Sequence, residues 1–97
     1  MPENPLFELG HCVMTPGIQD LIERYQFDAQ QFLVRHQTGD WSEMDTEDQA
    51  ANFEAINTGE RIFSKYTFRP NAEQNIDLYV ITEWDWSSTC LLLAEEY

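Results

Sequence analysis

Carboxylates are the side chains most able to do chemistry in this 97-residue chain. The segment between Arg35 and Arg61 has no lysine or arginine and carries Asp40, Glu43, Asp45, Glu47, Asp48, Glu54 and Glu60. Clustered carboxylates can ligate hard cations, supply acid–base catalysis or bind a basic surface. The formal net charge of -13 repels itself and favours a cationic partner. The alternative, a solvated face that only keeps the protein soluble, stays open.

Metal binding is the weaker interpretation of the polar residues. The segment from Asp40 to Asp45 lacks the alternating ligands and the loop glycine of an EF-hand. His11, Cys12, His36 and Cys90 do not have zinc-site spacing, and we interpret all four as structural residues. We therefore expect no metal and no cofactor.

Enzymatic motifs are missing from the sequence as well. No serine has a glycine elbow, and the chain has neither a phosphate-binding loop nor a dinucleotide-binding fingerprint. The carboxylates are predicted to be exposed, and exposed carboxylates are rarely tuned for proton transfer. The sequence predicts a binding protein that is not an enzyme.

Trp84 and Trp86 form a second candidate contact site around Asp85. In an extended stretch, residues two apart share a face, so the two indoles would project together from the end of a hairpin. Tryptophan is enriched in binding hot spots. The equally weighted alternative is that one or both cover the core. Trp41 is predicted to be a core residue.

Composition indicates one soluble domain. Hydrophobic residues make up 42% of the chain and aromatic residues 13%, which is sufficient for a folded core. Too few basic residues are present for direct binding to nucleic acid or to an anionic membrane. The N-terminus does not resemble a signal peptide and no apolar run reaches membrane-spanning length, so we expect a cytoplasmic protein.

Periodicity predicts an α+β fold, with three helices packed on one face of a small antiparallel sheet. Residues 1–8 are expected to be a loose lead-in, and residues 9–97 a single domain. The predicted order is one strand, three helices and three strands: strand 9–14, helices starting at Pro16, Asp28 and Asp45 or Thr46, and strands 61–69, 76–83 and 89–94.

The third helix carries most of the acidic block. With about 100° per residue, Gln49, Phe53 and Ile56 are predicted to face inward. Glu47, Asp48 and Glu54 then lie on the outer half, within about 10 Å along the axis. This charge density is of the same order as that of a nucleic-acid strand.

Several motifs resemble a family of short acidic bacterial proteins carried on plasmids and other mobile elements. The resemblance is carried by Leu9-Gly10, Met14-Thr15-Pro16-Gly17, Arg35-His36, Thr38-Gly39-Asp40-Trp41, Asn52, Ile62-Phe63-Ser64-Lys65-Tyr66, Val80-Ile81-Thr82-Glu83 and Leu92 to Tyr97. Trp84 and Trp86 depart from the residues usual in that family. The resemblance implies no established activity, but it implies a context in which small acidic proteins often protect mobile elements, some by imitating nucleic acid.

Together these observations predict a non-enzymatic acidic module that binds a basic groove of a host nucleic-acid-binding defence complex. Such a module would be an inhibitor of the anti-CRISPR or anti-restriction type. The alternative is a plasmid accessory protein that acts through homo-oligomerisation, including a homodimer, or through a plasmid-encoded partner.

Cys12 and Cys90 are predicted to be free, buried thiols, because a reducing compartment disfavours disulfides. Thiol titration of the freshly purified monomer, denatured without reductant, is expected to give two thiols per chain. A count of zero would contradict both the free thiols and the cytoplasmic expectation.

Overall fold

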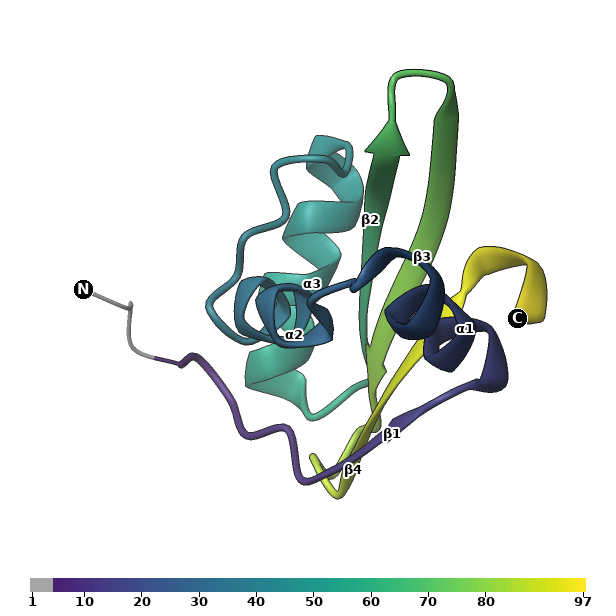
Figure 1. Cartoon of the computed structure of the whole chain (residues 1–97). Coiled ribbons are helices and arrows are strands. Elements are labelled where there is room, and N and C mark those ends of the chain that lie inside the picture. Colours follow the sequence, from purple (N-terminus) through teal and green to yellow (C-terminus); the bar gives the residue numbers. More distant parts are fainter. Residues whose placement is uncertain (1–4) are drawn as a thin grey trace.

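The computed structural model describes residues 5–97 and confirms the α+β fold with the predicted order of elements (Figure 1). The elements are β1 (His11–Met14), α1 (Pro16–Tyr25), α2 (Ala29–Gln37), α3 (Thr46–Thr58), β2 (Ile62–Asn71), β3 (Gln74–Thr82), β4 (Ser88–Leu93) and a final 3-10 turn, η1 (Ala94–Glu96).

The sheet has four strands in the order β1-β4-β3-β2. β2, β3 and β4 form the expected antiparallel meander. β1 instead pairs in parallel with β4, with Cys12 opposite Thr89 and Met14 opposite Leu91, so the sheet is mixed rather than wholly antiparallel. Hydrophobic alternation identifies a strand but does not reveal the direction of its neighbour.

One main core fills the space between the helices and one face of the sheet, as predicted. α1 packs against β4, α2 against β3 and α3 against β2. The strand residues of this core share a face by register: Ile62, Tyr66, Leu78, Val80 and Leu91. Figure 1 shows α2 and α3 on one side of the sheet, with η1 on the other side.

The described part of the N-terminal segment is attached to this core rather than loose. Residues 5–8 have no regular structure, but Phe7 is buried and its ring meets His36 edge-on at 5.0 Å. The Leu6 N–H donates to the Gln37 carbonyl oxygen at 2.8 Å. Prolines prevent regular secondary structure here, but they do not prevent burial of an aromatic ring.

Local sequence signals set the helix ends. Pro16 follows Thr15 at the start of α1, although the Thr15 hydroxyl donates to Glu96 instead of capping its own helix. Asp45 caps α3 by accepting the Asp48 N–H at 2.9 Å. α3 ends at Gly59, whose φ of 76° suits glycine. Phe27 and Phe32, which flank the start of α2 at the two positions of a hydrophobic staple, form a stacked ring pair.

α3 is rotated relative to the prediction. Its buried residues are Asn52 and Ala55, whereas Phe53 is 49% exposed. The Asn52 side chain donates to the Phe63 carbonyl at 2.9 Å and accepts the Phe63 N–H at 3.0 Å. This amide pairs with the edge of β2 as a further strand would, and this contact turns the apolar Phe53 ring outward.

The two cysteines are free, but the prediction that both are buried is wrong. Cys12 is exposed and Cys90 is half-buried. Because Cys12 pairs with Thr89 and Val13 pairs with Cys90, the two sulfurs lie on opposite faces of the sheet. The exposed β1 gives Cys12 no apolar layer to enter.

A buried hydrogen-bond network around His36 joins the helices to three strands. Trp41 Nε1–H donates to Ser64 Oγ at 2.6 Å, and Ser64 Oγ contacts His36 Nδ1. On the other side of the ring, His36 Nε2 lies 2.8 Å from Thr82 Oγ1. Thr82 Oγ1 lies 2.7 Å from Thr89 Oγ1, which donates to the Leu9 carbonyl at 2.7 Å.

The partners fix the direction of every proton in this network. The Thr89 hydroxyl donates to Leu9, so Thr82 must donate to Thr89 and accept from His36 Nε2–H. Burial lowers the pKa of His36 to about 3, so the ring is neutral. Because a neutral ring that donates from Nε2 has no proton on Nδ1, Nδ1 is the acceptor for the Ser64 hydroxyl.

The network predicts a stability loss in mild acid. Below the ordinary histidine pKa of 6.5, the unfolded chain binds a proton at position 36 that the folded chain does not bind. The free energy of unfolding therefore decreases as the pH is lowered. Between pH 6.5 and 5 we expect this residue to account for a loss of about 2 kcal/mol. Urea unfolding at several pH values measures it.

His36→Gln is the matched control, because glutamine keeps a donor and an acceptor but does not titrate. This variant is expected to be less stable at pH 7 and to lose less stability on acidification. Identical pH slopes for the wild type and the variant would show that His36 is not held neutral by the fold.

Candidate functional site

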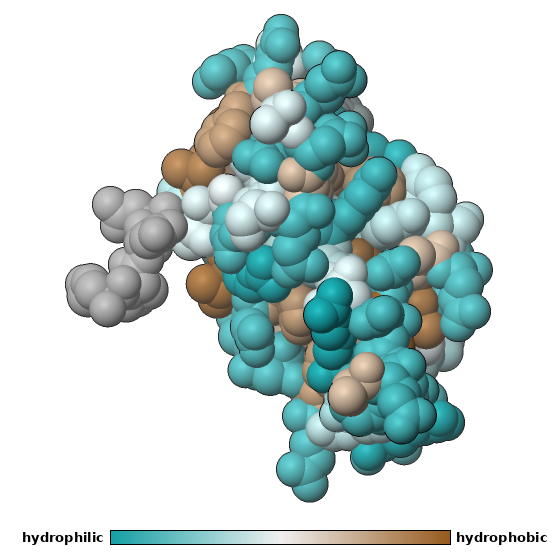
Figure 2. All heavy atoms as spheres, turned by 90° about the horizontal axis from the view of Figure 1, so that it is seen from above, coloured by the Kyte–Doolittle hydropathy of each residue, from teal (hydrophilic) through white to brown (hydrophobic). Residues whose placement is uncertain are grey.

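The acidic block occupies the loop between α2 and α3, the outer side of α3 and, at Glu60, the connection from α3 to β2. This loop and the start of α3 lie at the same end of the molecule as the β2–β3 turn. Seen from that end, hydrophilic residues cover most of the surface (Figure 2). The block is therefore presented to solvent, but its members do not have equivalent surroundings.

Asp40 and Glu43 are tied to Arg35. Arg35 Nε lies 2.8 Å from Asp40 Oδ2, and Nη2 lies 2.8 Å from Glu43 Oε2. The guanidinium stacks over the Tyr66 ring at 4.4 Å, and the Tyr66 hydroxyl donates to the Asp40 carbonyl at 2.9 Å. Partial burial alone would raise the pKa of Asp40, but hydrogen bonds from Arg35 and Ser42 lower it. These two acids hold the loop in place.

Two further acids of the block also have partners within the chain. Asp45 is the N-cap of α3, and Asp48 faces Lys65 at 3.7 Å with both side chains about half exposed. Glu43 additionally accepts the Thr67 N–H of β2 at 2.9 Å. Because the Asp48 pair is exposed, it leaves most of the carboxylate charge available to an approaching partner.

Glu47 and Glu54 make no ion pair or side-chain hydrogen bond with residues 5–97, and both are exposed. They are seven residues apart on α3, about 10 Å along the axis, and Ala50 and Ala51 lie between them on the same side. We call these four residues the α3 stripe. The small side chains of the two alanines leave room for a partner to approach the two carboxylates closely.

Apolar rings lie near the α3 stripe. Phe53 is exposed next to it, and its ring packs edge-on against Trp41 at 4.7 Å. Trp84 is 66% exposed in the β3–β4 turn. The backbone of this turn lies near Gly59, at the C-terminal end of α3 (Figure 1). Phe53 was missed because the sequence prediction turned it inward.

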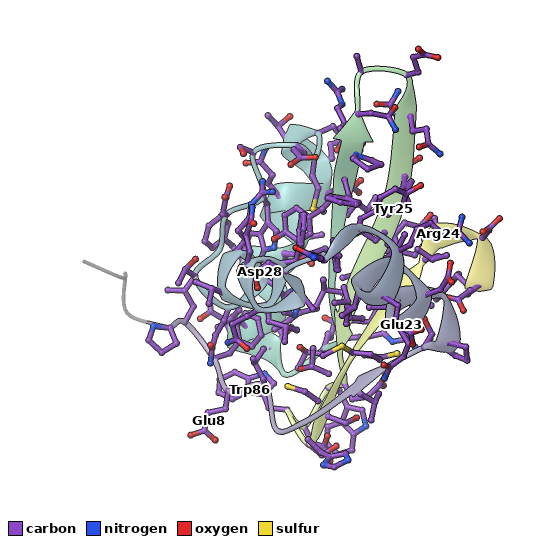
Figure 3. All side chains as sticks on the ribbon, viewed as in Figure 1. Glu8, Glu23, Arg24, Tyr25, Asp28 and Trp86 are labelled. Carbon is purple, nitrogen blue, oxygen red and sulfur yellow. The ribbon has the colours of Figure 1, made fainter. Side chains whose placement is uncertain are left out.

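Trp86 does not project together with Trp84. Trp86 has a φ of 59°, so the segment is a tight turn and not the extended stretch that would place both indoles on one face. The Trp86 ring packs on the core, 5.9 Å from Phe7, and lies beside the N-terminal segment near Glu8 (Figure 3). Its Nε1 is buried and has no hydrogen-bond partner within residues 5–97. The prediction of paired surface indoles is wrong for Trp86.

Within residues 5–97, no other group of side chains is arranged as a catalytic or metal-binding site. Ser64 and His36 are in contact, but both are fully buried and belong to the core network. Residues 5–97 contain no group of three or more His, Cys, Asp or Glu side chains that could hold a metal ion. A hollow of about 360 Å³ lies between α3 and β2, where Asp48 faces Lys65.

Comparisons with protein-family models, curated proteins and solved structures gave no match to this chain. The resemblance to plasmid-borne proteins therefore stays a prediction. Within residues 5–97, no helix has the length and apolar character needed to cross a membrane.

The different surroundings of the tryptophans predict their accessibility to a neutral quencher. Acrylamide is expected to quench the emission of Trp84 strongly and that of the buried Trp41 and the packed Trp86 weakly. Trp84→Phe should therefore remove most of the quenchable emission, whereas Trp86→Phe, the matched control, should leave it nearly unchanged. Equal quenching of the two variants would contradict this arrangement of the turn.

Proposed function

We propose that this chain is a non-enzymatic binding protein that imitates nucleic acid and occupies a basic groove on a nucleic-acid-binding protein or defence complex. The observation that carries the proposal is the α3 stripe, in which Glu47 and Glu54 are exposed and form no ion pair with any residue of the described range 5–97. The stripe lies on a helix that is anchored to the sheet, so its charges are held in fixed positions.

The distribution of basic residues supports this proposal. Four of the five basic side chains, Arg24, Arg35, Arg61 and Lys65, form ion pairs with acids outside the α3 stripe. The carboxylates of the stripe therefore contribute to an excess negative field that the chain does not neutralise. Such a field steers a basic partner toward this side and weakens as salt is added.

The small residues between the two carboxylates also support this proposal. The side chains of Ala50 and Ala51 leave room for lysine and arginine side chains of a partner to reach the carboxylates on either side. Asp45 and Asp48 add charge at the start of the helix, where acids also stabilise the helix dipole. Phe53 and Trp84 supply apolar surface at the flank and at the far end.

Charge reversal of the stripe tests this proposal. Glu47→Lys combined with Glu54→Lys is expected to weaken binding of a captured basic partner by about tenfold or more, because attraction becomes repulsion. The control is Glu23→Lys with Glu73→Lys, which changes the net charge equally at exposed positions elsewhere. The partner is captured at low salt from cells with active defence systems, and circular dichroism verifies folding.

A competition experiment with nucleic acid distinguishes imitation of nucleic acid from binding at another site of the partner. The wild-type chain is expected to displace a fluorescent nucleic acid from the captured partner, and high salt should weaken the complex. Equal affinity of the two double variants would exclude the α3 stripe as the contact surface. Simultaneous binding of the chain and the nucleic acid, or affinity independent of salt, would exclude mimicry.

A further inference from the structure

β1 is an edge strand with an uncovered outer side. It pairs only with β4 within the sheet, and all four of its residues are exposed. Val13 and Met14 are 42% and 37% exposed, which makes them two of the large hydrophobic residues on the surface. In Figure 1, β1 runs along the outside of β4.

The hydrogen bonds to β4 show which backbone groups of β1 are free to pair outward. The His11 N–H donates to the Ser87 carbonyl and the Thr15 N–H donates to the Leu91 carbonyl, so alternate residues point toward β4. In a parallel pair, the residues between them point the other way. The N–H and C=O groups of Cys12 and Met14 are therefore directed to the outer edge.

The two edge strands of the sheet, β2 and β1, differ in whether side chains of the chain bind their outer backbone groups. At the β2 edge, the Asn52 amide pairs with the backbone of Phe63, and Glu43 accepts the Thr67 N–H. β1 is short, with four residues, but it contains no lysine, proline or bulge that would block pairing with a further strand. One edge is closed by side chains of the chain itself, and the other is open to a further strand.

The distribution of charge indicates which strand can pair there. Residues 9–19 contain no aspartate, glutamate, lysine or arginine, although the chain has 18 acidic and 5 basic residues. Two copies with a net charge of -13 repel each other over most of their surfaces. The Glu96 carboxylate binds Thr15 and Gly17 of this segment, beyond the last residue of β1. At β1 itself two copies can therefore meet with little charge repulsion.

We propose that β1 pairs in antiparallel fashion with β1 of a second copy and joins the two sheets into one. The two-fold axis passes beside Val13, so that Cys12 exchanges backbone hydrogen bonds with the partner's Met14, and Met14 with the partner's Cys12. Val13 then faces the partner's Val13 and covers its exposed surface. This interface uses no residue of the α3 stripe and is independent of the function proposed for it.

Disulfide cross-linking tests the position of the axis. At the non-hydrogen-bonded pair on the axis the Cα atoms would be about 4.5 Å apart, within the range for a disulfide. Val13→Cys, in a background with Cys12→Ser and Cys90→Ser, is expected to give a covalent dimer on mild oxidation. Met14→Cys in the same background is the matched control, because its two copies would be separated by more than about 7 Å.

A second variant tests the free protein without any cross-link. Val13→Asp places two carboxylates against each other at the axis and is expected to weaken dimerisation by more than about tenfold. Val13 is exposed and the β1–β4 hydrogen bonds do not involve its side chain, so the fold should persist. Sedimentation equilibrium of the wild type and the variant measures the association.

The sedimentation and cross-linking results together either support or overturn the proposed dimer. A wild-type dimer that is weakened by Val13→Asp and cross-linked at position 13 but not at position 14 supports the proposal. A wild-type chain that is monomeric at high concentration overturns it. Equal cross-linking at position 13 and at the exposed Val34 of α2, replaced by cysteine in the same background, would also overturn it.

Discussion

The arrangement of the whole molecule depends on His36 being neutral and hydrogen-bonded on both sides of its ring. The ring connects α2 to β2 through Ser64 and to β3 through Thr82, and the chain of hydroxyls continues to β4 and Leu9. Because Thr89 donates to Leu9 and the buried ring is neutral, Thr82 donates to Thr89, His36 donates to Thr82, and Ser64 donates to His36. A second proton on His36 would remove the acceptor for the Ser64 hydroxyl and place a charge in the core.

The network also determines where the acidic surface lies. Trp41 enters the core through its bond to Ser64, which fixes the loop that follows α2. Outside the core, Arg35 binds Asp40 and Glu43 and packs on Tyr66, and this ion pair closes the same loop from the solvent side. α3 starts directly after this loop, so the positions of its exposed carboxylates depend on the neutral core network and on the two ion pairs of Arg35. Glu47 and Glu54 themselves make no ion pair or side-chain hydrogen bond within residues 5–97.

Features decided by neighbours along the chain were predicted well from the sequence, whereas features decided by tertiary pairing were not. The order of elements, the start of α3 at Thr46 and the burial of Trp41 depend on local spacing and on hydrophobicity. The rotation of α3 depends on an amide of Asn52 meeting the backbone of a strand ten residues later, and no periodicity contains that contact. Likewise, the direction of β1 and the turn at Trp86 are fixed by partners distant in sequence.

The sheet order places the α3 stripe and the open β1 edge at opposite sides of the molecule. α3 packs on β2, and β2 and β1 are the two edges of the sheet. If two copies pair through β1, the two β2 strands become the outer edges of one continuous sheet, separated by seven strand spacings, or roughly 34 Å. Both acidic stripes would then remain uncovered and face outward. A dimer of this kind would engage two grooves at once, and linked binding would strengthen the association without any new contact in either groove.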